Sequence, residues 1–348
     1  MSDISTDLQQ QVQTAHAEHT ALRIQGGNSK HFYGNPVDAE PLSLGPHSGI
    51  LSHEPTELVL TARAGTPLGE IESTLARHGQ MLSFEPPHFD GTATLGGAIA
   101  AGLGGPRRPW GGAPRDSVLG VKVLDGQGQI LSFGGQVMKN VAGYDVSRLM
   151  AGSLGALGAI LEVSLKVLPA PAKTRTLGLQ MSRAGALREM RELSRKPIPL
   201  SGACYLDDHL YLRLSGSHAS VNAWKQKIGG EEIAENSTFW QRLRDHQLDF
   251  FQTGEPLWRL SLAATSPRLA CEQQSLLDWA GAQRWVFSDQ DAISVREQVA
   301  EQGGHATLFR GHTGGDAFQA MDPLMLALQR RLKARFDPHG IFNPGRML

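Results

Sequence analysis

The feature that most constrains this chain is a glycine-rich stretch that runs from Phe89 to Gly158. Glycine accounts for 40 of the 348 residues, well above the usual share of about 7%. Ordering a glycine costs conformational entropy, so globular proteins use it where the backbone takes positive φ or closely approaches another group. Glycine-rich turns can also direct successive amide N–H groups at one anion. We therefore interpret the stretch as a cradle for a large, phosphate-bearing cofactor. The alternative is a set of tight turns in a β-rich domain.

Length, charge and cysteine content limit the classes of protein that the chain can belong to. A length of 348 residues suggests two domains, on a prior of about 150 residues each. A net charge of -1 does not indicate a protein that binds nucleic acid through excess positive charge. Cys204 and Cys271 form no C-x-x-C pair and are predicted to be reduced, buried thiols. No secretory signal and no apolar run of about 20 residues is found. We therefore expect a cytoplasmic chain without a transmembrane segment.

A second candidate anion site follows a short strand at residues 21–25. Glycine and asparagine tolerate left-handed backbone conformations, and serine and lysine add hydrogen-bond donors. A backbone nest around a pyrophosphate is therefore predicted here, with an ordinary hairpin turn as the alternative. Neither G-x-G-x-x-G nor G-x-x-x-x-G-K-[ST] occurs in the chain. The residues of this predicted nest are Gly26, Gly27, Asn28, Ser29 and Lys30.

A stiff segment at residues 169–171, Pro-Ala-Pro, is the predicted domain boundary. The preceding residues alternate between strands and helices, with a β-hairpin predicted at 118–133. Beyond the boundary, strands are expected at 176–181, 202–206, 210–214, 257–262, 284–287 and 306–309. Helices are expected between them, at about 184–195, 218–228, 238–250, 268–280 and 291–302. This irregular alternation favours an α+β domain with an antiparallel sheet, followed by a helix at 321–336.

Several motifs, in this order along the chain, together resemble a known family. They are Gly26-Gly-Asn-Ser29, Ala93-Thr-Leu-Gly-Gly97, Lys139-Asn-Val-Ala-Gly-Tyr-Asp145, Gly152-Ser-Leu-Gly-Ala-Leu-Gly-Ala-Ile160 and Asp337-Pro-His-Gly-Ile-Phe-Asn-Pro-Gly-Arg346. The chain is similar to the FAD-binding fold of the vanillyl-alcohol oxidase and p-cresol methylhydroxylase (PCMH) type. Within that fold it resembles the FAD-binding subunits of glycolate oxidase, also called glycolate dehydrogenase.

The resemblance implies an α+β fold in three parts. Residues 1–170 would form a PCMH-type FAD-binding domain of two α/β subdomains. Residues 171–316 would form a second α+β domain, a cap for substrate or a surface for interaction, with an antiparallel sheet. Residues 317–348 would be a C-terminal helix and tail that return to the FAD domain.

The resemblance also implies roles for individual residues. The nest at 26–30 would hold the FAD pyrophosphate, and 94–97 would pass close to the diphosphate and the flavin edge. Residues 152–160 would line the adenine and ribose side, and Asn343 would reach the isoalloxazine. Several relatives attach flavin covalently through a histidine at the position of Asn28, which cannot do so. Non-covalent FAD is therefore predicted, with His88 as a remote alternative anchor. The full set of implied cofactor-binding positions is Gly26, Gly27, Asn28, Ser29, Lys30, Pro86, Thr94, Leu95, Gly96, Gly97, Gly152, Ser153, Gly155, Gly158, Ile160 and Asn343.

The catalytic residues are less well marked. Hydroxy-acid dehydrogenases of this fold carry a histidine-rich metal cluster with an acid, which we do not find here, so no metal site is predicted. Oxidation of a hydroxy acid needs a base for the hydroxyl proton and a cation for the carboxylate. Arg310 and His312 are the best candidate pair. Arg107 and Arg108 could neutralise phosphate or face solvent, and Arg346 could offset charge on the flavin or simply end the chain.

The leading hypothesis is the FAD-binding subunit of a multi-subunit enzyme that oxidises glycolate to glyoxylate. Its expected partners are a larger flavin subunit, which the absent cluster suggests performs the chemistry, and an iron–sulfur subunit that takes the electrons. Those partners could hold the chain at the inner face of the membrane. One alternative is a self-sufficient, FAD-dependent oxidoreductase for a small 2-hydroxy acid. Another is a non-catalytic scaffold subunit that has lost its flavin.

Overall fold

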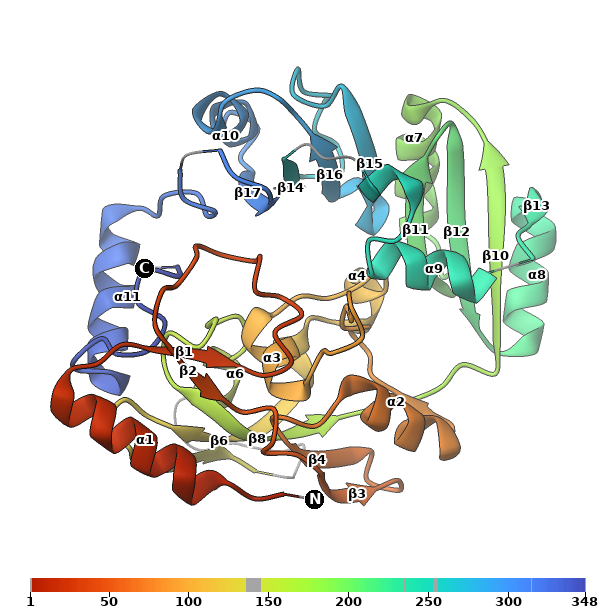
Figure 1. Cartoon of the computed structure of the whole chain (residues 1–348). Coiled ribbons are helices and arrows are strands. Elements are labelled where there is room, and N and C mark those ends of the chain that lie inside the picture. Colours follow the sequence, from red (N-terminus) through yellow and green to blue (C-terminus); the bar gives the residue numbers. More distant parts are fainter. Residues whose placement is uncertain (1, 136–144, 235, 253–255, 314, 348) are drawn as a thin grey trace. The chain divides into compact units, whose positions relative to one another are not determined.

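A computed structural model describes residues 2–135, 145–234, 236–252, 256–313 and 315–347 (Figure 1). The chain divides into two compact units. Unit 1 comprises Met1–Gly104, Gly112–Ala170 and Ala320–Leu348, and unit 2 comprises Gly105–Gly111 and Pro171–Gln319. Each unit combines helices with sheets, which confirms the predicted α+β class. The first six residues of the predicted Lys139–Asp145 motif lie outside the described residues.

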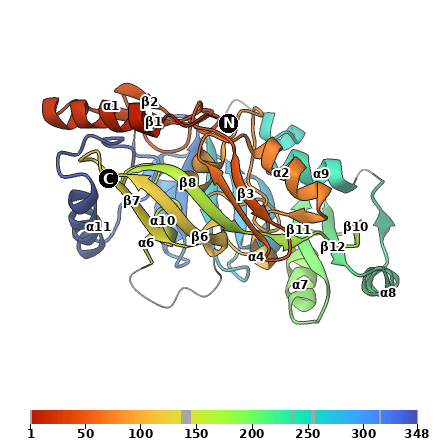
Figure 2. The same cartoon turned by 90° about the horizontal axis from the view of Figure 1, so that it is seen from below.

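A five-stranded antiparallel sheet forms the centre of unit 1 (Figure 2). Among the described residues its strand order is β3-β4-β8-β6-β7. Its strands are β3 (Ile50–Glu54), β4 (Val59–Arg63), β8 (Ala159–Lys166), β6 (Val118–Leu124) and β7 (Ile130–Gly134). The hairpin predicted at 118–133 is present as β6 and β7. β8 is the middle strand and is buried at most of its positions, because a strand with neighbours on both sides and layers on both faces favours a continuous apolar run.

The remaining elements of unit 1 surround this sheet. They are α1 (Ser5–Glu18), β1 (Leu22–Gln25), β2 (Glu40–Ser43), α2 (Leu68–Arg77), β5 (Gln80–Met81), α3 (Leu95–Ala101), α5 (Pro114–Ser117), α6 (Val146–Leu149), β9 (Leu168–Pro169) and α11 (Pro323–Phe336). α2 buries Leu68, Ile71 and Leu75 on one face, as its 3–4-residue spacing predicts. β1 and β2 pair in parallel, and β5 pairs with β9.

The C-terminal tail returns to the first strand of the chain. Phe342 forms a parallel bridge with Leu22, the Leu22 amide donates to the Ile341 carbonyl at 2.7 Å, and the Asn343 amide donates to the Leu22 carbonyl at 2.9 Å. The buried Asp337 carboxylate fixes the approach to this segment, because it accepts from the amides of Ile341 and Phe342 at 2.9 Å each. The last residues of unit 1 therefore extend the sheet of β1 and β2.

Unit 2 contains an eight-stranded antiparallel sheet within the part of the chain that the structure describes. Its order is β13-β10-β12-β11-β15-β16-β14-β17. The strands are β10 (Lys173–Gln180), β11 (Leu200–Leu206), β12 (His209–Gly216), β13 (Glu231–Glu232), β14 (Leu257–Ser261), β15 (Gln274–Asp278), β16 (Gln283–Phe287) and β17 (His305–Arg310). The six strands expected from the sequence are all present, and the sheet is antiparallel as predicted.

The helices of unit 2 are α4 (Arg108–Gly111), α7 (Arg183–Ser194), α8 (His218–Ile228), α9 (Asn236–Arg244) and α10 (Ala292–Ala300), with short 3-10 helices η1 (Asp249–Gln252) and η2 (Trp279–Gly281). The prediction of a helix at 268–280 is wrong, because strand β15 lies in this region. β15 lies inside the sheet between β11 and β16, and Leu276 and Leu277 are fully buried. A short apolar run of this kind fits a buried strand or a buried helix equally well.

The segment Gly105–Gly111 belongs to unit 2, although the sequence around it belongs to unit 1. Trp279 donates its indole N–H to the Gly105 carbonyl at 3.1 Å, and the Arg108 guanidinium lies 4.5 Å from the centroid of that indole. Arg107 donates to the Ser215 hydroxyl at 3.4 Å. Arg107 and Arg108 thus attach this segment to unit 2, a structural role that was not among the alternatives set out for them.

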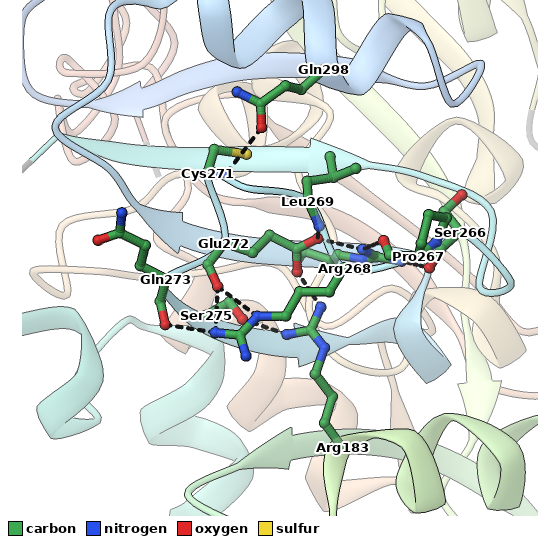
Figure 3. A network of polar contacts seen from close by, with 11 residues as sticks. Arg183, Ser266, Pro267, Arg268, Leu269, Cys271, Glu272, Gln273, Ser275 and Gln298 are labelled. Carbon is green, nitrogen blue, oxygen red and sulfur yellow. Dashed lines mark hydrogen bonds and ion pairs between the residues drawn. The ribbon is translucent and has the colours of Figure 1, made fainter.

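A buried network of ion pairs and hydrogen bonds surrounds Glu272 in unit 2 (Figure 3). The fully buried Glu272 carboxylate pairs with both Arg183 and Arg284, and it accepts from the Leu269 amide at 3.1 Å. Arg284 also donates to the carbonyls of Ser266 and Pro267. Burial lowers the pKa of the Arg183 guanidinium, and the negative charge of Glu272 opposes that shift. The network therefore holds the loop between β14 and β15 against α7 and β16.

No helix among the described residues is both long and apolar enough to cross a lipid bilayer.

We expect Glu272→Gln to lower the free energy of unfolding of the chain by about 3–5 kcal/mol, because it leaves two arginines without the charge that compensates them. Chemical denaturation followed by tryptophan fluorescence measures this change. Glu301→Gln is the control, because Glu301 is exposed at the end of α10 and its replacement should change stability by less than about 0.5 kcal/mol. Equal, small effects of both substitutions would contradict the structural role of the network.

Candidate functional site

The candidate site is a hollow in unit 1, bounded by the end of β1, the start of α3, the 154–160 turn and strand, and the C-terminal tail. Of these elements, β1 and α3 are labelled in Figure 1. About 800 Å³ of space between the residues that line the hollow is free of protein atoms, and part of this space is open solvent. Most of the predicted cofactor positions line it, namely Gly26, Gly27, Asn28, Ser29, Lys30, Thr94, Gly96, Gly97, Gly155, Gly158, Ile160 and Asn343.

Asn343 fixes the floor of this hollow. Its side-chain oxygen accepts from the Ile24 amide at 2.9 Å, and its side-chain nitrogen donates to the Leu154 carbonyl at 2.6 Å. The residue is 3% exposed and adopts φ 42°, a left-handed conformation that asparagine tolerates better than most residues. In the structure the Asn343 amide thus joins β1, the tail and the 154 turn. Its predicted contact with the isoalloxazine remains a prediction.

The loop after β1 needs glycine because other chain segments come very close to it. A Cβ atom on Gly27 would lie 1.5 Å from the Thr92 carbonyl oxygen, and one on Gly26 would lie 2.2 Å from the Thr94 hydroxyl. Neither glycine takes positive φ, whereas Asn28 does, at 61°. Close approach, and not the left-handed backbone invoked above, therefore explains both glycines.

Asp90 and Thr92 hold that loop from the opposite side. Asp90 accepts from the Thr92 amide at 3.0 Å and from the Thr92 hydroxyl at 2.7 Å. The same hydroxyl lies 2.5 Å from the Gly27 carbonyl, to which it can donate. Although burial raises the pKa of the Asp90 carboxyl, the hydrogen bonds from Thr92 and the charge of Lys30 outweigh it, so that pKa is lowered. Asp90 is therefore ionised near neutral pH, which suits its role as an acceptor.

The amides of Gly26 to Ser29 are available to a ligand, because none of them donates to another residue that the structure describes. The first turn of α3 is different. There the Leu95 amide donates to the Thr66 carbonyl at 2.9 Å and the Gly96 amide to the Ala64 carbonyl at 2.8 Å. The expected anion-binding amides are therefore those of the first loop, while Leu95 and Gly96 anchor the start of α3.

Thr94 presents a buried hydroxyl to this hollow. The residue is 5% exposed, and its Oγ1 atom has no hydrogen-bond partner among the described residues. Thr94 precedes α3 but makes no side-chain capping bond to it. A buried, unsatisfied hydroxyl costs about 1–3 kcal/mol, so this hydroxyl is a candidate hydrogen-bond partner for a ligand in the hollow.

The charged side chains at the hollow are cationic. Arg23, Lys30 and Arg346 line it together with His31, and no carboxylate is among the described residues that line it. Arg346 is held by bonds from its guanidinium to the carbonyls of Lys30 and Tyr33, at 3.2 and 3.0 Å. Burial and the nearby charge of Arg23 lower the pKa of Arg346. An anion bound here would relieve this repulsion between cations.

Four predicted positions lie apart from the hollow. Gly152 and Ser153 line a neighbouring surface hollow, and their turn rests on α3, since the Gly152 amide donates to the Ile99 carbonyl at 3.0 Å. Leu95 belongs to the hydrophobic core of unit 1, and Pro86 is buried. Within the described part of the chain these residues support the walls, and their contact with a cofactor remains a prediction.

The predicted catalytic pair lies in unit 2, not in the unit that holds the hollow. Arg310 is the last residue of β17 and is half-buried, and burial lowers the pKa of its guanidinium. His312 follows in an exposed segment after the bend at Gly311. Among the described residues no group of three or more His, Cys, Asp or Glu side chains is arranged to hold a metal ion.

Two kinds of residue escaped the sequence reasoning. Arg23 belongs to β1, where a charged residue in a short strand indicates only an exposed position. Asp90 and Thr92 act through a turn that closes against Gly27, more than 60 residues away in the sequence. The aspartate two residues before a threonine is a recognisable turn pattern, but it does not reveal the segment on which the turn rests.

The residues present fit FAD. A diphosphate needs several hydrogen-bond donors and nearby positive charge, which the free loop amides, the Thr94 hydroxyl and the three cations provide. Apolar groups suited to the uncharged parts of the cofactor complete the lining, among them Ile24, Leu44, Ala100, Leu154 and Ile160.

Comparison with known proteins agrees with this geometry. Residues 5–134 match the family model described as FAD binding domain, and residues 318–347 match that of the FAD linked oxidases, C-terminal domain. The glycolate oxidase subunit GlcE of Escherichia coli (strain K12) is 47% identical over 345 residues, which cover 99% of this chain and 97% of that one. The glycolate oxidase subunit GlcD of Bacillus subtilis (strain 168) is 30% identical over 176 residues, or 50% of this chain and 37% of that one.

Among solved structures, p-cresol methylhydroxylase with substrate bound superposes with a TM-score of 0.75. The match covers 99% of this chain and 87% of that one at 14% sequence identity. At this identity the likeness establishes the fold, which is the PCMH type.

We expect Gly27→Ala to weaken FAD binding by at least about tenfold, because the added methyl group overlaps the Thr92 carbonyl and must displace the loop. Titration of the flavin-free protein with FAD, followed by flavin fluorescence, measures this. Gly69→Ala is the matched control, since a Cβ atom on Gly69 of α2 would meet nothing within 4 Å. If both variants bind FAD like the parent protein, the loop does not hold the cofactor.

Thr94→Val is expected to have opposite effects on two measured quantities. It should weaken FAD binding by about 10- to 100-fold, the value of a hydrogen bond to a charged group. It should leave the stability of the flavin-free protein unchanged or raise it, because a buried unsatisfied hydroxyl is removed.

Thr61→Val provides the comparison for this prediction. The Thr61 hydroxyl is also buried but is bonded to Ser164 at 2.9 Å, so its loss should lower stability without changing FAD affinity. Unchanged FAD affinity in Thr94→Val would remove this hydroxyl from the site.

Proposed function

The chain belongs to the family of FAD-binding glycolate oxidase subunits represented by GlcE, and on this premise we propose that it is the FAD-carrying subunit of a multi-subunit glycolate dehydrogenase. The complete enzyme would oxidise glycolate to glyoxylate and pass the electrons to an iron–sulfur partner. The observation that carries the proposal is the identity of 47% over nearly the whole chain. It is supported by a hollow whose donors and charges suit a dinucleotide.

The cofactor is FAD, which supplies the redox chemistry when it is bound. We propose that the amides of Gly26 to Ser29 and the Thr94 hydroxyl hold its diphosphate, with Arg23, Lys30 and Arg346 compensating the negative charge. We also propose that the flavin is held without a covalent bond, because the loop position that some relatives fill with histidine is Asn28 here. The remote alternative, His88, lies 3.0 Å from the Glu72 carboxylate and does not line the hollow.

The proposed partners are a larger flavin subunit and an iron–sulfur subunit. The similarity to GlcD supports the first of these, since the 176 matched residues form half of this chain but only 37% of GlcD. GlcD is therefore a longer chain, part of which is related to half of this chain. Through such partners the chain could be held at the inner face of the membrane.

The site of hydride removal from glycolate is assigned to the larger flavin subunit in this proposal. A self-sufficient oxidoreductase is the competing proposal, in which Arg310 would bind the substrate carboxylate and His312 would take the hydroxyl proton. Both side chains lie in unit 2, so this alternative depends on that unit and can be tested apart from FAD binding.

The decisive experiment isolates the tagged chain from its native source and separately produces it alone. We expect the native preparation to contain a second flavoprotein chain and an iron–sulfur chain, and to reduce a dye with glycolate. The chain alone should carry FAD that acid precipitation releases completely, and should leave the dye oxidised. Glycolate-dependent reduction by the chain alone, lost in Arg310→Gln, would favour the self-sufficient enzyme. A colourless chain that cannot take up FAD would favour the scaffold.

A further inference from the structure

The last helix of the chain, α11, is attached to unit 1 through its C-terminal half. Leu332 and Phe336 pack against the hydrophobic core, and the ring of Phe336 lies 6.3 Å from that of Phe133. The Lys333 ammonium donates to the Ala156 and Phe342 carbonyls at 2.9 and 3.0 Å, and pairs with Asp337 at 2.9 Å. These contacts position the tail that closes the FAD hollow.

The N-terminal half of α11 exposes large apolar side chains. Leu324 is 77% exposed, Leu328 is 57% exposed and Met325 is 48% exposed, and none of the three packs against the core clusters of the described residues. Asp322 and Pro323 give this end a regular start, since the Asp322 carboxylate accepts from the Leu324 amide at 2.9 Å. The helix is thus well formed at a point where its apolar side chains are exposed in the part of the chain that the structure describes.

The same exposed face becomes basic toward the C-terminal end of the helix. Leu324, Leu328, Arg331 and Arg335 follow one another at helical spacing and are all exposed. No carboxylate of a described residue pairs with either arginine. The helix itself, Pro323–Phe336, contains no acidic residue. The face therefore combines an apolar end with an uncompensated positive end.

We propose that this face of α11 docks a partner protein subunit whose surface combines an apolar groove with carboxylates at one end. The inference rests on the proposed function, in which the chain works inside a complex. Burial of Leu324 and Leu328 would supply affinity, and the carboxylates would pair with Arg331 and Arg335 to fix the direction of docking.

The order of residues along the helix favours a protein over a membrane surface. A helix that lies on a bilayer carries apolar residues along one face and basic residues along the other. On α11 the apolar and basic side chains occupy successive turns of one face. A membrane that contacted Leu324 would therefore also contact Arg331 and Arg335 on the same face. A protein groove with matching halves accommodates both.

The test uses the full chain, tagged and isolated from its native source, with the larger flavin subunit quantified by mass spectrometry. Leu324→Ser with Leu328→Ser removes the apolar end, and Arg331→Glu with Arg335→Glu reverses the basic end. Each pair should lower recovery of the larger flavin subunit by at least about tenfold. Association of the parent chain should also weaken as salt is raised, because the charges are exposed.

Matched controls change comparable side chains elsewhere. Ile293 of α10 is 68% exposed, so Ile293→Ser tests the loss of an exposed aliphatic residue. Arg188 and Arg191 of α7 are exposed, so Arg188→Glu with Arg191→Glu tests the same reversal of charge. Recovery of the larger subunit should match that of the parent chain in both controls, and visible flavin absorbance should be retained in all variants.

Each other outcome has a definite meaning. Normal recovery of the larger subunit in both α11 variants overturns the docking proposal and leaves the proposed function intact, whereas its absence from the parent preparation overturns the proposed function. Loss of flavin together with the partner in both variants would assign α11 to the FAD hollow alone. In a further outcome the complex persists in the variants, but they no longer bind phosphatidylglycerol vesicles as the parent chain does; the face would then dock a membrane. If the variants instead lose the ability to dimerise while the complex persists, the face would dock a second copy of the chain.

Discussion

The side chain of Asn343 makes the two hydrogen bonds on which the geometry of the candidate site depends. It joins the Ile24 amide and the Leu154 carbonyl, groups that lie 319 and 189 positions away in the sequence. Because both bonds are buried, losing the amide would leave two backbone groups unsatisfied, at a cost of about 1–3 kcal/mol each. This one residue therefore ties β1 to the 154 turn, next to the loop whose amides we propose to bind the FAD diphosphate.

The two units treat buried charge in opposite ways. In unit 2, the carboxylate of Glu272 lies between Arg183 and Arg284, and the loop carbonyls accept the remaining guanidinium protons. In unit 1, the cations Arg23, Lys30 and Arg346 line a hollow, and no carboxylate is among the described residues that line it. The first arrangement is complete within the chain and serves stability. The second gives the hollow a positive lining, which suits the diphosphate that we propose as its ligand.

Local sequence pattern was sufficient to predict most helices and strands. It did not explain why particular residues, such as Gly26 and Gly27, are needed at their positions. Alternation and helical spacing predicted the hairpin of β6 and β7 and the strands of unit 2. They failed at β15, where Leu276 and Leu277 are buried in the middle of a sheet and give no alternation. Gly26 and Gly27 were predicted to face a ligand because glycine tolerates a left-handed backbone, but neither residue has positive φ. The close approach of the Thr92 carbonyl explains Gly27 instead. Local sequence does not record which distant segment approaches a turn.

The sequence alone determined that this chain is an α+β flavoprotein, because its glycine motifs and its tail motif, taken in order, resemble those of the PCMH-type family. It also predicted the loop of residues 26–30 as a source of hydrogen-bond donors, but not the contribution of Arg23. Only the tertiary structure decided which of those groups are free. The amides of Leu95 and Gly96 donate to the carbonyls of Thr66 and Ala64, whereas the Thr94 hydroxyl has no hydrogen-bond partner among the residues that the structure describes. The physical reason is that hydrogen-bond satisfaction depends on contacts between segments far apart in the chain, which no local periodicity encodes.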